Sequence, residues 1–192
     1  MTSTFQSLLA TGTILDVFSQ SISGEPVTTV LFADSAPLDD AFVSLSVPAG
    51  TTTRAAVTSI LASSNIPLPL AAYTAADRPL PRPAAFFGPV TDALQSLADD
   101  LHAHVFAFRS AIFMLGREAP APVCEIPPDD LLDLITTGRE EILLTTTLKG
   151  LPIGSIVRAG DFTGRATCQI IDADTGEGPW LTKLILRRLP YD

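Results

Sequence analysis

Alternating apolar and polar positions predict three β-strands in the first quarter of the chain. Residues 13–19 and 27–33 are rich in Val, Ile, Leu, Phe and Thr, and a Ser-Gly-Glu-Pro sequence between them predicts a hairpin turn. Residues 42–47 alternate strictly until Pro48, which predicts a third strand. The N-terminal part is therefore expected to consist of strands.

The end of the chain shows the same alternation, interrupted by glycines. Strands are expected near residues 141–148, 155–159, 163–172 and 181–188. The glycines among them match no phosphate-binding loop, so we expect them to serve turn geometry. Four strands at this spacing favour a small antiparallel barrel or sandwich, which the N-terminal strands could complete.

The centre of the chain changes to a helical period. Apolar residues between Ala55 and Leu61 form a stripe that predicts a helix, capped by one of the two threonines at 51 and 52 and ended by prolines at 67 and 69. Residues 65–89 then contain six prolines. Since proline is excluded from helix and ladder interiors, we expect an ordered loop or an arm lying on a neighbouring subunit.

A second helix and a hairpin follow this segment. Apolar residues recur with a helical spacing from Val90 to Leu101, directly after Gly88-Pro89. Two short apolar runs around Arg109-Ser110 then predict two strands joined by a tight turn. Helix followed by hairpin predicts an α+β unit with one layer packed on another.

The expected fold class is α+β, with a small antiparallel β-barrel formed by N- and C-terminal strands and an inserted helix-plus-hairpin unit. The stretch Asp-Asp-Leu-Leu-Asp-Leu-Ile-Thr is expected to form at most two helical turns within a proline-rich linker. The predicted division of the chain is N-terminal barrel strands over 1–48, the inserted unit over 49–117, the linker with its short helix over 118–139, and C-terminal barrel strands over 140–192.

Composition limits the classes of partner. Of the 192 residues, 46% are hydrophobic and 17% are charged, below the roughly 25% that is usual for soluble domains, which suggests that partners cover part of the surface. The net charge of -9 argues against binding nucleic acid through its phosphates. The N-terminus lacks the basic start of a secretory signal, and no apolar run reaches about 18 residues, so we expect a protein made in the cytoplasm without a membrane span.

The sequence offers few candidates for chemistry. His102 and His104 would lie on one face of a strand beside Asp99 and Asp100, but no third ligand is evident, so surface or interface histidines are expected rather than a metal site. The spacing of Cys124 and Cys168 fits neither zinc nor a disulfide framework, and both are expected to be packing residues.

Charged pairs also favour surface roles. Four acidic pairs are expected mostly at helix starts or in loops, and four arginines are expected at solvated strand edges or partner contacts. No nucleophile motif is present, so we expect no catalytic, cofactor-binding or metal-binding residue and no enzyme. The pairs are Asp39-Asp40, Asp99-Asp100, Asp129-Asp130 and Glu140-Glu141, and the arginines are Arg158, Arg165, Arg187 and Arg188.

The order of these elements resembles that of phage tail baseplate hub proteins, the late-control-protein type of contractile injection systems. TGTILDVFSQ and TTVLFADS, followed by the Pro-Ala-Gly-Thr-Thr helix entry at 48–52, are similar to the family's strand pair and first helix. FFGPVTDALQSLADDLHAHVFAFRSAIFMLGR resembles its helix and strand-turn-strand, and the stretch from Leu143 to Leu189 resembles its last barrel. Only about 45 residues precede the first helix, fewer than is usual for such hubs, so we expect either a hub of reduced length or a different subunit that supplies the missing part.

This resemblance implies a tail-tube-like barrel, no catalysis and no cofactor. It implies a virion protein of the tail baseplate, in a homo-oligomer expected to be a trimer, between the tail tube and the central spike. An acidic wall around the lumen would let DNA pass without specific binding. The alternatives are another tail or head-completion adaptor with different symmetry, and a small hydrolase or metal-binding enzyme that uses His102 and His104.

Overall fold

The chain forms two compact units, Met1–Met114 and Leu115–Asp192, which we describe separately. The computed structural model describes residues 12–22, 24–33, 38, 40–66, 68–137, 141–149, 151–173 and 180–189. Among these residues, no helix is both long enough and apolar enough to cross a membrane.

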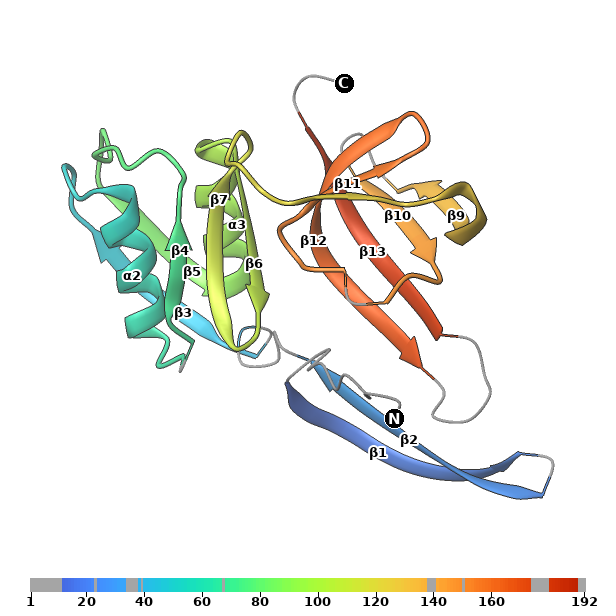
Figure 1. Cartoon of the computed structure of the whole chain (residues 1–192). Coiled ribbons are helices and arrows are strands. Elements are labelled where there is room, and N and C mark those ends of the chain that lie inside the picture. Colours follow the sequence, from blue (N-terminus) through green and yellow to red (C-terminus); the bar gives the residue numbers. More distant parts are fainter. Residues whose placement is uncertain are drawn as a thin grey trace, which may run out of the picture. The chain divides into compact units, whose positions relative to one another are not determined.

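The first unit begins with the predicted hairpin, whose strands are longer than expected (Figure 1). Strand β1 (Thr13–Ile22) pairs antiparallel with β2 (Glu25–Ala33), and a bulge follows Ile14. The tight turn requires positive φ at Gly24, which glycine adopts without steric cost. These two strands form a sheet of their own.

The rest of the first unit packs two helices with two small sheets. Val43 and Val47 of one sheet, Val57 and Ile60 of the first helix, and residues of the second helix share one core. The elements are β3 (Phe42–Val47) antiparallel to β5 (Ala84–Pro89), a sheet in the order β4 (Leu70–Tyr73), β7 (Ala111–Gly116) and β6 (Ala103–Phe108), and helices α2 (Thr53–Ser63) and α3 (Val90–Asp100).

Local signals for the helices and the second hairpin are confirmed. Helix α2 begins after Thr52, whose side-chain oxygen accepts a hydrogen bond from Ala55 N at 3.3 Å. It ends at Ser63, a turn before the first proline that was expected to stop it. Helix α3 starts directly after Pro89, and the turn between β6 and β7 places Arg109 and Ser110 in left-handed conformations.

The proline-rich segment 65–89 is part of the first unit rather than a separate arm. It contains β4, which pairs parallel with β7, and β5, which pairs antiparallel with β3 (Figure 1). Residues 74–83 form the expected ordered loop, but the prediction missed the short strands at either side of it. The prolines flank these strands, and Pro89 lies at a strand end where a missing N–H costs little.

The second unit is one curled six-stranded sheet (Figure 1). Its concave side holds a core that includes Leu144, Val157, Leu184 and Leu186. The strands run in the order β8 (Val123–Glu125), β11 (Ile156–Ala159), β12 (Phe162–Ala173), β13 (Trp180–Arg188), β10 (Glu141–Thr146) and β9 (Leu131–Thr136), with a 3-10 turn, η1 (Pro128–Asp130), before β9.

The short helix expected between 118 and 139 is wrong beyond residue 130. Residues Leu131–Thr136 form strand β9, which pairs antiparallel with β10. Six residues are too few for a stable helix, and the open edge of β10 offers backbone hydrogen bonds that outweigh the weak helical preference. The linker also contains β8, which pairs parallel with β11 and was not predicted.

The α+β class agrees with the structure, but a closed barrel is not formed by the sheets of the described residues. The predicted barrel joined N-terminal to C-terminal strands. Instead β1 pairs with β2, and β3 pairs with β5, within the first unit. Alternation predicted β1, β2 and β3 but did not determine that β3 pairs with β5, because pairing depends on contacts far apart in sequence.

Gly164 has a packing role, although the glycines of the C-terminal strands were all expected to serve turn geometry. It lies inside β12, where an added Cβ would come within 2.7 Å of the Phe162 ring and 3.0 Å of the Arg187 carbonyl oxygen. We expect Gly164→Ala to lower the free energy of unfolding of the second unit by about 1–3 kcal/mol, because the ladder leaves no room for a methyl group. Urea unfolding measures this, and an unchanged free energy of unfolding would contradict the packing role.

Candidate assembly surfaces

The β1–β2 hairpin exposes large apolar side chains along most of its length. Ile14 is 62% exposed and Val17 53% exposed, although both lie in a regular antiparallel ladder. No residue of either strand belongs to the two core clusters of the described chain. The exposed apolar residues are Ile14, Leu15, Val17, Phe18, Val30, Leu31 and Phe32.

Both faces of the hairpin are apolar. Cross-strand partners point to the same face of a sheet, so the pairs Ile14–Phe32 and Val17–Val30 share one face, which we call the Ile14 face. Ser19 and Thr28 continue this face and approach each other with side-chain oxygens 3.0 Å apart. The opposite face carries Phe18 and Leu31. A hairpin with two apolar faces in water is unusual, because a solvated face is normally polar.

The convex face of the second unit also carries an apolar row. Four strands contribute Ile135, Leu143, Ile185 and Cys168, which are successive cross-strand partners, and we call them the Ile185 row. Ile135 is 48% exposed, and Ile170 in a row further along is 51% exposed. Leu144 and Leu184 on the alternating positions are fully buried, which confirms that the Ile185 row faces away from the core.

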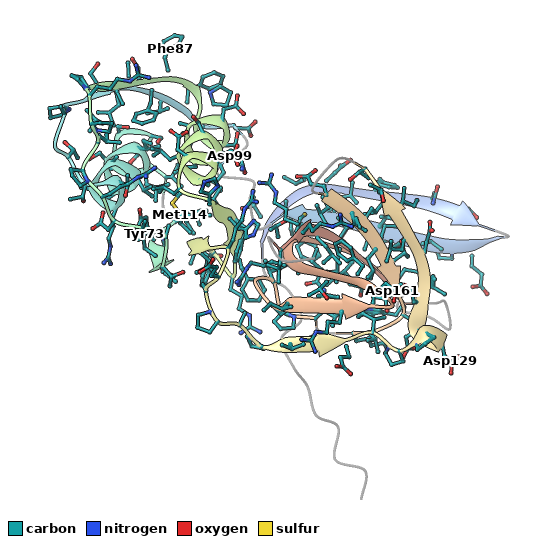
Figure 2. The ribbon with its side chains drawn as sticks, turned by 90° about the horizontal axis from the view of Figure 1, so that it is seen from above. Tyr73, Phe87, Asp99, Met114, Asp129 and Asp161 are labelled. Carbon is teal, nitrogen blue, oxygen red and sulfur yellow. The ribbon has the colours of Figure 1, made fainter. Side chains whose placement is uncertain are left out.

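A third apolar surface lies on the outer side of the β3–β5 sheet. Phe87 is 90% exposed and Phe42 is 70% exposed, and Figure 2 shows the Phe87 side chain projecting from the ribbon. Their ladder partners are Ser44 and Pro89, so both rings are on the same face. The other face carries the buried Val43 and Val47.

The histidines are separated by the end of helix α3. His102 follows the helix in a left-handed turn and is exposed, whereas His104 lies in β6 and is buried. The prediction that the two share one strand face is therefore wrong, because the strand starts only at Ala103. Within the described ranges, no group of three His, Cys, Asp or Glu side chains is placed to hold a metal ion.

One cysteine packs and the other does not. Cys124 in β8 is half-buried against the core of the second unit, in agreement with the prediction. Cys168 is exposed, contrary to the prediction. The reason is a bulge between Ala166 and Cys168, which brings Cys168 opposite Ile185 on the convex face.

Three carboxylates of the acidic pairs make local structural contacts. Asp99 and Asp100 end helix α3 rather than begin a helix, and the Gln95 amide donates to Asp99 Oδ1 at 2.7 Å. Asp130 accepts from the Thr147 hydroxyl at 2.7 Å. Glu141 accepts from Arg187, at 3.0 Å in their ion pair. Asp39 and Glu140 lie outside the described residues.

Arg165 is the largest fully buried side chain of the described residues, which the sequence did not indicate. Its Nη1 donates to the Gly154 carbonyl at 2.8 Å, and its Nη2 donates to the carbonyls of Arg117 and Ala119. Burial lowers the pKa of its guanidinium. The side chain thereby holds the segment before β8 on the sheet. By contrast, Arg158 is exposed with Glu125 at 3.7 Å, and Arg188 is exposed, but they lie in the inner strands β11 and β13 rather than at an edge of the sheet.

A shallow hollow of about 450 Å³ lies in the first unit beside Thr53 and Arg78. Its polar groups already have protein partners: Thr53 Oγ1 lies 2.8 Å from the Tyr73 hydroxyl, and Arg78 donates to the Asp100 carbonyl at 2.8 Å. Burial raises the pKa of Tyr73, so it remains protonated and keeps this bond well above neutral pH. The hollow is therefore part of the packing between α2, α3 and the loop near Pro79.

The fold is shared with two solved phage tail structures. A tail protein from Neisseria meningitidis MC58 superimposes with a TM-score of 0.62 and 11% identity, over 94% of this chain and 80% of that chain. A 43 kDa tail protein of prophage MuSo2 from Shewanella oneidensis gives a TM-score of 0.60 and 12% identity, over 94% of this chain and 77% of that chain. No protein-family model and no curated protein sequence matches the chain.

The similarity includes nearly the whole chain, so it concerns the order and arrangement of elements rather than one common motif. At 11–12% identity, few side chains are shared, and the likeness shows the fold alone. The resemblance to tail proteins stated from the sequence is thus confirmed at the level of fold, and the specific assignment to a hub is taken up below.

Proposed function

We propose that this chain is a non-enzymatic structural subunit of a phage tail, placed in the baseplate hub between the tail tube and the central spike. The observation that carries the proposal is the shared fold with two phage tail proteins over 94% of the chain. Its place of action would then be the virion, and its partners would be further copies of itself and the tube and spike proteins.

The exposed surfaces support an assembly role. Monomeric soluble proteins rarely leave large contiguous apolar patches in water, and such patches mark interaction sites. This chain exposes apolar residues on the hairpin, on the Ile185 row and around Phe87. Three such surfaces fit a subunit that is covered on several sides by neighbours, and the low share of charged residues fits the same role.

The distribution of charge supports a place beside a DNA-conducting lumen. Residues 1–53 contain no lysine or arginine, and they include the carboxylates Asp16 and Glu25 of the hairpin. A surface of this kind repels phosphates, so DNA would pass without binding. We therefore propose that the acidic N-terminal part contributes to the lumen wall in the assembled ring, and that the barrel expected from sequence is completed only in the assembly.

Light scattering of the purified chain tests the oligomeric part of this proposal. We expect a particle of three chains, each of 20.3 kDa, because hubs on the tail axis are trimeric by the family resemblance. A ring with another number of copies would favour a tail or head-completion adaptor instead. A monomer that remains monomeric with its neighbouring tail proteins present would contradict the proposal.

A further inference from the structure

We propose that Arg165 is a positioning residue that holds the segment between the two units on the sheet of the second unit. This segment comprises residues 117–122, which we call the strap. The chain passes between the units only once, from Met114 to Leu115, and the strap begins after Gly116. With the strap held, the flexible joint between the units is confined to Leu115 and Gly116, and release of the strap lengthens that joint.

The first half of the strap is held by the Arg165 guanidinium. Its Nη2 donates to the Arg117 carbonyl at 3.3 Å and to the Ala119 carbonyl. The Ala119 amide donates to the Gly116 carbonyl at 2.9 Å, and this turn brings both acceptors to the same donor group. Nη1 donates to the Gly154 carbonyl at 2.8 Å, in the loop before β11. One side chain therefore ties the strap to the sheet and to a loop of the second unit.

The second half of the strap is held by the backbone. The Ile156 amide donates to the Pro122 carbonyl at 2.9 Å, directly before β8 joins the sheet beside β11. Strand β8 has only three residues and lies at the edge of the sheet, so it offers few ladder hydrogen bonds. Segments with few buried contacts open locally at low cost. The contacts of Arg165 are thus the main attachment of the strap.

The strap covers a position that is otherwise solvated. Arg165 is the ladder partner of Ile156, and Arg158 lies two residues further along β11, so both arginines are on the convex face. The Arg158 side chain is 55% exposed, whereas Arg165 is fully buried although it faces away from the core. The difference is that the strap carbonyls lie against the Arg165 guanidinium.

The charge of Arg165 makes this attachment reversible. Within the described part of the chain, no carboxylate pairs with its guanidinium, and its Nε has no hydrogen-bond partner. Carbonyl oxygens alone therefore offset the cost of burying a cation. Opening of the strap returns the guanidinium to water and recovers part of that cost. The strap is accordingly an element that opens and closes rather than a permanent part of the core.

Release changes the freedom between the two units. A flexible segment of six residues has a root-mean-square span of about 13 Å, whereas the held strap has a single path along the sheet. With the strap held, a neighbour that fixes one unit also restricts the other. Arg165 thereby controls whether the two units move together or separately, which goes beyond the proposed structural role in a tail.

Limited trypsin digestion of the full chain tests the attachment, because trypsin cleaves after Arg117 inside the closed turn. We expect slow cleavage there in the parent. Arg165→Ala should speed this cleavage by about tenfold or more, since cleavage follows the population of the open strap. Mass spectrometry identifies the products, residues 1–117 and 118–192. Arg158→Ala, on the same face but exposed, should change the rate by about twofold or less.

A destabilised core variant separates strap release from general unfolding. Leu184→Ala removes a fully buried side chain of the same unit and leaves the contacts of the strap in place. Where Trp180 fluorescence shows both variants folded, cleavage after Arg117 should be about fivefold or more faster in Arg165→Ala than in Leu184→Ala. Equal rates in the two variants would overturn the role of Arg165.

Hydrogen exchange of the parent chain tests the closed strap without any substitution. The amides of Ala119 and Ile156 donate within the held strap and to it. We expect both to exchange about tenfold or more slowly than amides of an unstructured peptide. Exchange of Ala119 at the rate of an unstructured peptide would overturn the inference, even where Arg165→Ala does not fold.

A distance measurement between spin labels tests the restriction of movement. With Cys124→Ser, labels are attached to Ala62→Cys on α2 and to Cys168 on β12, which are exposed positions of the two units. Arg165→Ala should widen the distribution of distances by about 5 Å or more. Arg158→Ala should leave the distribution unchanged. An equally broad distribution in the parent and in folded Arg165→Ala would show that the strap does not restrict the units, and would contradict the inference.

Discussion

Replacing Arg165 by alanine is expected to lower the free energy of unfolding of the second unit by about 3 kcal/mol. Its guanidinium donates to the carbonyls of Gly154, Arg117 and Ala119 while fully buried. Hydrogen bonds to a charged group contribute about 1.5–3 kcal/mol each net of the water contacts that they replace, the burial of the charge offsets part of this gain, and truncation also leaves a cavity. Trp180, the sole tryptophan, lies in β13 and reports this unfolding by fluorescence.

Two further variants serve as controls for Arg165→Ala. Arg165→Lys should recover part of the loss, because one ammonium group cannot reach three carbonyls in the planar geometry of a guanidinium. Arg158→Ala on the neighbouring strand should cost less than about 0.5 kcal/mol, since its ion pair with Glu125 is exposed. Equal losses for Arg165→Ala and Arg158→Ala would contradict the anchoring role of Arg165.

Replacing Ile60 by alanine is expected to destabilise only the first unit, by about 3 kcal/mol. Ile60 is fully buried in the core of that unit, and the second unit has a separate core. Circular dichroism at the helical band follows the first unit, because α2 and α3 are its elements. The unfolding midpoint of that signal should fall, while the midpoint of Trp180 fluorescence should not change.

The conservative variant Ile60→Val serves as the control and should lose about 1 kcal/mol in the same signal. A matching fall of the Trp180 midpoint in Ile60→Ala would show that the two units unfold as one. That outcome would overturn the description of two units with independent cores.

Sequence patterns predicted the local elements better than their pairing. The strand at 42–47, the Thr52 cap and the turn at Arg109-Ser110 each depend on neighbouring residues, and the structure agrees with them. The helix expected after Asp130 failed because an open strand edge decided the conformation of that segment. Which strands pair depends on distant contacts, so the pairing of β3 with β5 could not be predicted from alternation.

For the candidate surfaces as well, some features could be predicted from the sequence and others depend on the fold. The sequence indicated apolar strands and missing surface charge, but it could not show that both faces of the hairpin are exposed. The bulge before Cys168 changes the face on which that residue lies, and no residue type marks it. Arg165 resembles a solvated arginine in sequence, because only the fold brings the three carbonyls around it.

Electron microscopy of tail particles that carry a labelled version of this chain tests the central claim most directly. The account predicts label at the end of the tail tube, arranged around the tail axis with three-fold symmetry, and no complete tails when the chain is omitted. Fully formed tails without any copy of the chain, alongside a monomeric chain in solution, would contradict it.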